Sequence, residues 1–390
     1  MRSRPQTRGR GGVAVLVALV AQAAGPHAWT LRGPTPAQKG GLSARRRPGP
    51  AHKGPRRRWT PPSATTTPAA AAEDAGDWPT AALSGGQIYE ALDEFSHHAG
   101  KRVVVKYGGH AMSDAHAADC FAKDVVLMQR LGVKPVVVHG GGPQIGEMLE
   151  RLQVPTRFVE GLRVTDAATI EVAEMVLGSI NKAISAAIAS AGGHALGLSG
   201  RDDSLIVAEK LVKKTVGDTA VDLGFVGTPL SVNADLLESL LDQRVIPVIA
   251  PIAAGTGKSD EAFSLNADTA AGAVAAALGA SRLLLLTDVP GVLDGEGRLV
   301  DEVTPETAKT LIDEGVIRGG MLPKIETALY AVNSGVQGAA IVDGRIPHAV
   351  LKELFSPQGA GTLVLSSSSA KAEGSSSDEE EEAASSSSES

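Results

Sequence analysis

Between about residue 85 and residue 365, short apolar runs alternate with segments whose apolar residues recur at helical spacing. Residues 103–105 and 136–138 are runs of three valines, and residues 283–286 are four leucines. Strands that are apolar throughout are typical of parallel sheets covered by helices on both faces. We therefore expect an α/β fold, a three-layer αβα sandwich with a mostly parallel central sheet.

The sequence predicts which residues form each strand and each helix. Strands are expected at 103–105, 135–139, 244–249, 282–287 and 339–343, with a hairpin over 156–164. Helices are expected at 87–98, 114–131, 142–152, 167–191, 268–278, 303–314 and 321–333. Between 196 and 227 the sequence predicts only short strands and turns.

The net charge of −7 is unevenly distributed along the chain. Residues 1–72 carry 13 Arg or Lys and no acid, whereas residues 366–390 carry seven acids against Lys371, so the part between them has a net charge of −14. An acidic body offers no basic field to a phosphate backbone, so nucleic acid is not expected as a partner. The single cysteine, Cys120, cannot form an intramolecular disulfide and is expected to be a small core residue.

Residues 1–72 are expected to be a targeting presequence in two parts. Residues 1–28 combine four arginines with an apolar run that is short for a membrane span, as in signal peptides. Residues 29–72 are rich in Arg, Lys, Pro, Thr and Ala, like a transit peptide. This order resembles the bipartite leaders of algae with secondary plastids, which implies the plastid stroma and no membrane in the mature form. The alternative is a secreted protein with a basic disordered linker.

The folded part is expected to span residues 85–365, followed by a disordered, solvating Ser/Glu tail at 366–390.

Glycines and charged residues follow several of the expected strands, where ligands of parallel sheets bind. Lys106 precedes Gly108 and Gly109, which leave backbone N–H groups open to a phosphate. Glycines 140–142 begin a helix, which makes an anion site. The other groups are Asn266 with Asp268 at a helix start, the turn 287–292, and Lys324 after two glycines. Taken alone, 103–110 is equally consistent with a solvated lysine and a plain turn.

Two glycine patterns imitate nucleotide-binding motifs. In residues 140–146 the third glycine comes one place late for G-x-G-x-x-G. Residues 257–259 resemble the end of a P-loop, but Ile252 stands where its first glycine is required, and acidic residues follow instead of a helix. We expect this second segment to be a hairpin tip.

Together, six phrases resemble the amino acid kinase family, in the expected order over residues 85–365. They are VVVKYGG (103–109), VVVHGGGPQIG (136–146), GLRVTD (161–166), LNADTAAG (265–272), LLLLTDVPGV (283–292) and GGMLPK (319–324). GLRVTD resembles the acetylglutamate kinase branch more than the carbamate, aspartate, glutamate or uridylate kinases. The resemblance implies ATP-dependent phosphorylation of the side-chain carboxylate of N-acetyl-L-glutamate, in arginine synthesis.

The resemblance also implies roles for individual residues. Lys106 and Lys324 would neutralise the transferring phosphoryl group, Asp268 would hold both lysines, and Gly109 and Gly141 would donate N–H groups to it. Acetylglutamate would be bound by Gly141, Gly142, Arg163, Ser264 and Asn266, with Arg163 clamping a carboxylate. ATP, with Mg²⁺ bridging its phosphates and no all-protein metal cage, would be bound by Gly108, Asp288, Val289, Pro290, Gly291, Val292, Leu293, Val316, Ile317 and Arg318.

Simpler explanations exist for several of these residues. Arg163 could be a surface charge of the hairpin, Asp268 only a helix cap, and Lys324 an ordinary helix lysine. His110 and His139 are expected to be packing or turn residues, because a carboxylate nucleophile is already ionised at neutral pH. Ser264 departs from the family pattern, which usually has Asn at that position; serine is shorter, so weaker substrate binding or a bridging water is expected.

The resemblance extends to regulation. The helix at 87–98 is similar to the extra N-terminal helix of arginine-inhibited hexameric members, trimers of dimers, and residues 348–362 are similar to their arginine pocket. Arginine is therefore expected as an effector, near Tyr89, His348, Glu353 and Gly361. Plastid members also imply a PII-type nitrogen-signalling protein as a partner.

Two alternatives to an acetylglutamate kinase stay open from the sequence. One is another member of the family, such as a carbamate or glutamate kinase. The other is a regulatory homologue without catalytic activity, which the retention of Lys106, Asp268 and Lys324 argues against.

Overall fold

The structure, a computed structural model, describes residues 85–108, 112, 114–159, 161–214, 220–257, 261–356 and 359–367. The expected presequence, the acidic tail from 368 onward, Gly109 and His110 lie outside the described residues.

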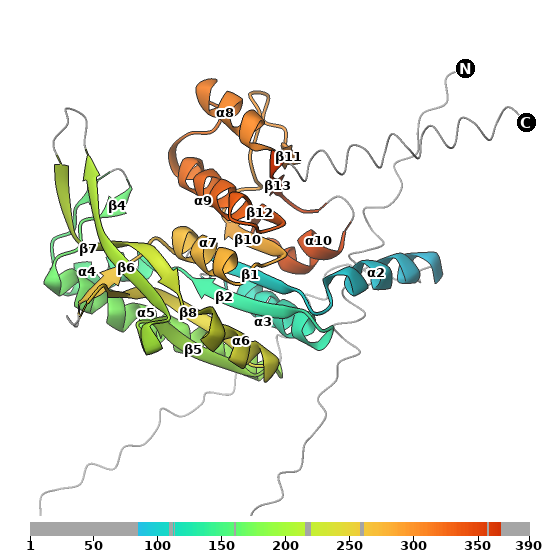
Figure 1. The fold of residues 1–390 in the computed structure, drawn as a ribbon, viewed down its shortest axis with the longest axis horizontal. Coiled ribbons are helices and arrows are strands. Elements are labelled where there is room, and N and C mark those ends of the chain that lie inside the picture. Colours follow the sequence, from blue (N-terminus) through green and yellow to red (C-terminus); the bar gives the residue numbers. More distant parts are fainter. Residues whose placement is uncertain are drawn as a thin grey trace, which may run out of the picture. The chain divides into compact units, whose positions relative to one another are not determined.

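Within the described residues, eleven strands form one sheet in the order β11-β13-β12-β10-β1-β2-β8-β6-β7-β9, and β5 also pairs with β8 (Figure 1). The strands are β1 (Arg102–Tyr107), β2 (Lys134–His139), β5 (Ala195–Gly200), β6 (Ile206–Lys214), β7 (Ala220–Val232), β8 (Ile246–Gly255), β9 (Ala262–Ser264), β10 (Arg282–Thr287), β11 (Glu302–Val303), β12 (Gly338–Asp343) and β13 (Thr362–Val364). Strands β3 (Phe158–Val159) and β4 (Leu162–Arg163) form the expected separate hairpin. The central pairs β10–β1, β1–β2, β2–β8 and β10–β12 are all parallel, which confirms the mostly parallel sheet.

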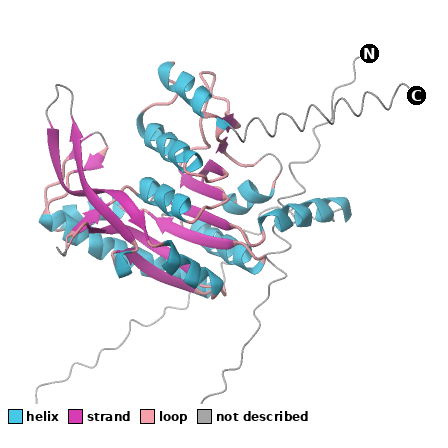
Figure 2. Ribbon diagram, in the orientation of Figure 1, coloured by secondary structure: helices cyan, strands magenta, loops and turns pink. Residues whose placement is uncertain are grey.

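Helices cover both faces of this sheet (Figure 2). They are α2 (Gly85–His98), α3 (Ala115–Arg130), α4 (Gly142–Arg151), α5 (Ala167–Ser190), α6 (Ala234–Asp242), α7 (Ala267–Ala277), α8 (Pro305–Asp313), α9 (Leu322–Asn333) and α10 (Ala349–Phe355).

Alternate side chains of the central strands pack into different cores. Val104 and Val138 belong to the core under α7 and α9, which contains Ala271 and Ile325. Residues 103, 105 and 137 belong to the opposite core, with side chains of α3, α5 and α10. Both faces of β1 and β2 are therefore buried, as their continuous valine runs require.

The region between 196 and 232 differs from the expectation of short strands. Strands β6 and β7 span nine and 13 residues and pair antiparallel, with register shifts along the ladder. Glycines and Pro229 lower the strand propensity of β7. Pairing with β6 outweighs this local preference, because tertiary contacts influence β-structure more than the propensity of single residues does.

Helix α6 was not expected from the sequence, although a signal was present. Asn233 caps the helix by accepting a hydrogen bond from Leu236 N at 3.3 Å, and Leu237 and Leu241 are buried at helical spacing. The following strand accordingly begins at Ile246, two residues later than expected, and runs on to Gly255.

Strands β8 and β9 are antiparallel neighbours, so the segment between Gly255 and Ala262 connects the two strands of a hairpin. The tip predicted at residues 257–259 falls largely on residues 258–260, which lie outside the described residues. Cys120 is buried in α3, which confirms the expectation of a core residue.

Among the described residues, α5 is the one helix whose length and composition would allow it to cross a bilayer. Core helices of soluble proteins pass the same test, and α5 buries Ile184 and Ile188 against the sheet.

Candidate active site

The carboxylate of Asp268 lies between two lysine ammonium groups. Lys106 Nζ is 2.9 Å from Asp268 Oδ1, an ion pair without hydrogen-bond alignment. Lys324 Nζ donates to Asp268 Oδ2 at 2.9 Å. Lys106 comes from the carboxyl end of β1, Asp268 from the first turn of α7, and Lys324 from the first turn of α9. Three residues far apart in the sequence thus form one cluster, as the sequence predicted.

This cluster carries a net charge of +1 in a buried place. Lys106 and Asp268 are only 8% and 7% exposed. Burial by itself would raise the pKa of Asp268, but the two ammonium groups outweigh it and hold the pKa below its usual range. Burial also lowers the pKa of Lys106, and Asp268 opposes that shift. One carboxylate cannot balance two lysines, so the site favours an anion beside them.

A cavity of about 270 Å³ opens onto this cluster. Its walls include both members of the Lys106–Asp268 pair, and they contain the residues expected to bind acetylglutamate, which are Gly141, Gly142, Arg163, Ser264 and Asn266. Asn266 also caps α7, since its side chain accepts from Asp268 N at 2.8 Å. Asp268 is therefore inside the capped first turn, while Asn266 is the cap.

Two glycines of the site are required by their surroundings. A Cβ on Gly141 would lie 2.7 Å from Leu177 Cδ2 and 2.8 Å from Ile180 Cδ1. A Cβ on Gly108 would lie 2.9 Å from Leu286 O and 3.2 Å from Lys106 Nζ. Gly141 is the N-cap of α4, so the backbone can approach a ligand closely where the helix dipole favours an anion.

Arg163 is anchored in the cavity wall. Its guanidinium donates to Gly142 O and to Thr156 Oγ1, both at 3.1 Å, and lies 4.6 Å from the ring centroid of Phe158. These contacts orient the fork, as a carboxylate clamp needs. Arg163 is thus not a free surface charge. Thr156 and Phe158 were not expected as site residues, because nothing in a hairpin sequence shows which side chains will contact an arginine.

The residues expected to line the nucleotide site divide into two groups. Val289 and Leu293 are exposed, whereas the side chains of Val292 and Ile317 are buried in the core. The N–H of Val292 already donates to Thr362 Oγ1 at 2.8 Å. The apolar side chains of Val292 and Ile317 complete the core, so the backbone of these two residues is the part that could contact a nucleotide, and their place in the nucleotide site stays a prediction. Asp288, Pro290, Val316 and Arg318 remain at or near the surface, while Gly291 is buried.

Three of the residues expected at an effector site lie around α10. His348 Nδ1 is 2.5 Å from Asp124 Oδ1, and Glu353 accepts from Ala360 N at 2.6 Å and Gly361 N at 3.1 Å. Helix α2 packs against the same helix, since the rings of Phe95 and Phe355 have centroids 4.0 Å apart. Tyr89, earlier on α2, is 71% exposed.

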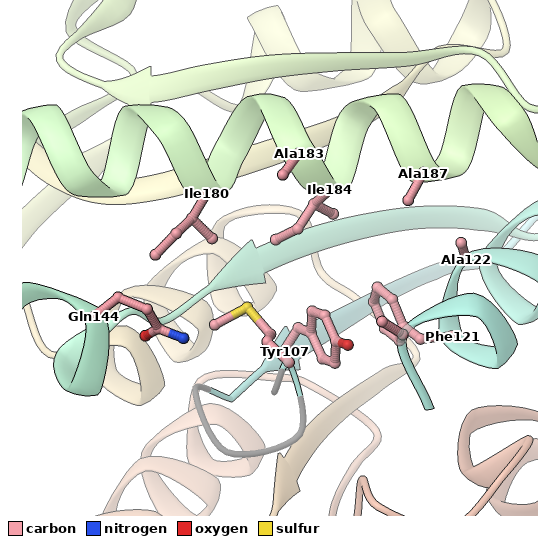
Figure 3. Close-up of a pocket in the computed structure, with 10 residues that line it drawn as sticks. Tyr107, Phe121, Ala122, Gln144, Ile180, Ala183, Ile184 and Ala187 are labelled. Atoms are coloured by element: carbon pink, nitrogen blue, oxygen red, sulfur yellow. The ribbon is translucent and has the colours of Figure 1, made fainter. Parts of the chain in front are cut away.

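A second cavity, of about 220 Å³, lies on the other face of the sheet between α3 and α5. In Figure 3, Ile180 and Ile184 point from α5 toward Tyr107 and Phe121. The tyrosine and phenylalanine rings stack with centroids 3.9 Å apart. Its apolar lining does not match a charged substrate, so the polar cavity at Lys106 is the candidate active site.

The sequence matches known proteins over most of its length. The model of the amino acid kinase family matches residues 101–343. Acetylglutamate kinase from Rhodospirillum centenum is 54% identical over 77% of this chain and 99% of its own length. Acetylglutamate kinase from Rhodospirillum rubrum is 55% identical, over 72% of this chain and 92% of its own length.

Among solved structures, N-acetylglutamate synthase from Neisseria gonorrhoeae has the same fold, with a TM-score of 0.63 at 23% identity, over 71% of this chain and 62% of that chain. The family match covers the candidate active site from Lys106 to Lys324 and every strand of the sheet except β13. The chain therefore belongs to the amino acid kinase family, in the acetylglutamate kinase group.

Proposed function

We propose that this chain transfers the γ-phosphoryl group of ATP to the side-chain carboxylate of N-acetyl-L-glutamate, giving N-acetyl-L-glutamyl 5-phosphate for arginine biosynthesis. The observation that carries the proposal is a single cavity that contains the Lys106–Asp268 pair, the glycine loop 140–142 and the anchored Arg163. Relatives that are 54% and 55% identical are acetylglutamate kinases, which supports this substrate.

Arg163 and the glycine loop are proposed to bind the acetylated amino acid. The guanidinium fork would hold a carboxylate in two parallel hydrogen bonds, with Ser264 and Asn266 at the same cavity wall. This leaves the side-chain carboxylate of the substrate facing Lys106. Being ionised at neutral pH, it can attack phosphorus without a general base.

The lysines and the Gly141 amide are proposed to stabilise the phosphoryl group during its transfer. Phosphoryl transfer requires mainly positioning and charge stabilisation, and a preformed +1 cluster supplies both without reorganisation. Asp268 would keep Lys106 and Lys324 apart and oriented. Gly109 is proposed as a second N–H donor by its place in the motif.

Mg²⁺ is proposed to be held by the ATP phosphates, whose charge it would neutralise. Both oxygens of Asp268 face lysines, so this carboxylate does not fit a metal ligand. Among the described residues no group of three or more His, Cys, Asp or Glu gathers at one point. The turn at Asp288–Leu293, in which Asp288, Val289, Pro290 and Leu293 are exposed, is proposed to bind the nucleotide together with Gly108 and the backbone of residues 316–318.

A coupled assay of ADP release tests the proposal. With purified protein, ATP and a panel of acids, turnover should require acetylglutamate and be much slower with glutamate, aspartate or carbamate. Equal rates with glutamate would favour another kinase of the family, and no turnover with any acid would favour a non-catalytic regulatory homologue.

We further propose that arginine is a feedback inhibitor bound near α10. Gly361 N donates to Glu353 there, His348 is the N-cap residue of the same helix, and α2 packs on that helix through Phe95. A guanidinium would find the half-buried carboxylate of Glu353 already held by two backbone N–H groups. Activity at limiting acetylglutamate that is unchanged by millimolar arginine, a weak-binding concentration, would contradict this.

The cellular setting is proposed from the sequence. The two-part presequence at 1–72 supports a plastid stroma, and resemblance to plastid members supports a PII-type partner. The resemblance of the helix at 87–98 to that of arginine-inhibited members supports a hexamer. Residues 1–72 fused to a fluorescent protein should direct it to plastids, and secretion of the fusion would contradict the location.

A further inference from the structure

The imidazole of His139 is fully buried behind the glycine loop and takes no part in the mechanism above. His139 lies in register with Tyr107, and Lys106 lies in register with Val138. Side chains alternate between the faces of a strand, so His139 and Lys106 point to opposite faces. Val138 belongs to the core under α7 and α9, whereas Tyr107 belongs to the core under α5. His139 therefore supports the glycine loop from the face opposite the lysine cluster.

Two contacts define the state of this imidazole. His139 Nδ1 is 2.9 Å from Gly140 O, and His139 Nε2 is 3.2 Å from Asn181 Nδ2. Asn181 Nδ2 also lies 2.8 Å from Val248 O and 3.2 Å from Leu198 O, both acceptors, so this atom is the amide nitrogen and its two N–H groups are shared among the two carbonyls and His139 Nε2. An NH₂ group facing Nε2 requires a lone pair there, so the ring proton is on Nδ1 and is donated to Gly140 O. Burial agrees with a neutral ring, since it lowers the pKa of His139 to about 4.

The carbonyl of Gly140 and the N–H of Gly141 belong to one peptide unit. In a trans peptide these two groups point in opposite directions, and the described chain contains no cis peptide bond. A carbonyl held toward His139 thus turns the N–H of Gly141 away from the imidazole, toward the face that carries Lys106. Glycine has wide backbone freedom, so a Gly–Gly peptide without such a bond could rotate easily.

We propose that His139 is a positioning residue, with its tautomer set by Asn181, that fixes the Gly140–Gly141 peptide so that the Gly141 N–H faces the transferring phosphoryl group. This inference rests on the proposed function, which identifies the group facing the Gly141 N–H as a phosphoryl group. Histidine here acts through the backbone and exchanges no proton with substrate.

Two matched amide variants separate this role from simple packing. In His139→Asn the amide nitrogen can occupy the place of Nδ1 and still donate to Gly140 O, whereas in His139→Gln the amide reaches the place of Nε2. We expect kcat to fall roughly tenfold to a hundredfold in His139→Gln, the order caused by a shift of about 1 Å in a positioned group. His139→Asn should stay within about threefold of the parent because the donor is kept. KM for ATP should change little in both variants.

Asn181→Leu gives a second test through a double-mutant cycle. Without Asn181, His139 can take the other tautomer, whose Nδ1 lone pair repels Gly140 O, so kcat should fall. Asparagine at position 139 has no alternative tautomer. Asn181→Leu should therefore lower kcat less in the His139→Asn background than in the parent, and the effects of the two substitutions on kcat should not add as free energies. Any purely structural loss from the bonds to residues 198 and 248 is common to both backgrounds and cancels.

Binding of ADP with aluminium fluoride, a mimic of the phosphoryl group in flight, provides a readout without turnover. It should weaken in His139→Gln and recover in His139→Asn, while binding of ADP alone stays unchanged. Equal losses in the Asn and Gln variants, a loss confined to KM, or an additive cycle would overturn the positioning role. If the parent binds the mimic but does not phosphorylate acetylglutamate, the proposed function fails and the variant comparison still decides the role of His139.

Discussion

At the scale of single residues, the site is built around an imbalance of charge. Two lysines share one aspartate, and Lys106 and Asp268 are buried while Lys324 is partly buried. Removing ammonium groups from water is costly, and Asp268 offsets only part of that cost. A phosphoryl group that enters the site neutralises the remaining positive charge. Binding of the ligand therefore also stabilises the cluster.

Lys106→Met should lower kcat by about 10²–10³, the usual effect of removing one preorganised charge-stabilising group. Lys101→Met is the matched control, because Lys101 is an exposed lysine just before β1. The control should keep kcat within about twofold, as surface substitutions do. Steady-state kinetics at saturating substrates checks both; a loss under threefold in Lys106→Met would remove this residue from the proposed mechanism.

Ser264→Asn should tighten binding of acetylglutamate. Ser264 is half-buried in the cavity wall, and an amide there reaches farther than a hydroxyl. One additional hydrogen bond of about 0.5–1.5 kcal/mol would lower KM for acetylglutamate about twofold to tenfold. Because no charged group of the cluster changes, kcat should stay constant. An unchanged or raised KM would show that serine is already the better fit.

At the scale of secondary-structure elements, α3, α10 and α2 form a unit that packs on the face of the sheet opposite to the one that carries the lysine cluster. Asp124 of α3 and His348, at the start of α10, make a short contact, and His348 has a left-handed backbone with φ of 58°. Such a backbone is strained for a residue other than glycine and is held here by its side-chain contact. Phe95 and His98 of α2 pack on Phe355 of the same helix.

The contact between α3 and α10 should make stability depend on pH. The hydrogen bond to Asp124 raises the pKa of His348 above its ordinary 6.5, so its contribution is complete below 6.5 and is lost as pH rises through the raised pKa. Burial raises the pKa of Asp124 to about 6, opposed by His348, so this proton too is held more tightly in the native state.

The gap in melting temperature between the parent protein and His348→Gln should therefore be larger at pH 6 than at pH 9. His97→Gln, a change at an exposed histidine of α2, should show no such trend. Scanning calorimetry at the two pH values would decide, and a gap of constant size would argue against the ion pair.

Glu353→Gln should weaken inhibition by arginine if the effector site is near α10. Loss of a hydrogen bond to a charged group, about 1.5–3 kcal/mol, would raise the half-inhibiting arginine concentration roughly tenfold or more. The kcat value without arginine should not change, since Glu353 is on a different element from the cavity. A variant with unchanged arginine sensitivity would place the effector elsewhere.

At the scale of the whole molecule, α2 presents Tyr89 and Leu92 to solvent while its other side packs on α10 (Figure 1). Large apolar side chains that stay exposed on one helix face are suited to contact with another subunit. This agrees with the proposed hexamer, in which the terminal helix would join dimers.

Leu92→Glu should reduce the assembly size if α2 joins subunits. Leu152→Glu is the matched control, because Leu92 and Leu152 are 52% and 53% exposed but lie on different elements. A buried, unpaired carboxylate is costly in an interface and harmless in water. Mass measured by sedimentation should fall for the first variant alone; equal masses for both would exclude this helix from the interface.

The sequence by itself determined the alternation of strands and helices, because apolar periodicity is a local property that can be read along the chain. It also carries the motifs whose resemblance to the amino acid kinase family made Lys106, Asp268, Lys324 and Arg163 candidate site residues. The long β6–β7 ladder could not be predicted, because its pairing is decided by partners and not by its own residues.

Only the tertiary structure decided how these residues act together. It showed that Val292 and Ile317 complete the core, that Thr156 and Phe158 orient Arg163, and that His139 and Asn181 hold the glycine loop from behind. The physical reason is that the direction of a hydrogen bond and the burial of a side chain depend on which strands and helices are its neighbours. The type of a residue, by contrast, is the same whatever its neighbours are. The run 103–110 thus specified a strand ending in a lysine and two glycines, and the neighbouring strands and helices gave that lysine its carboxylate, its second lysine and its cavity.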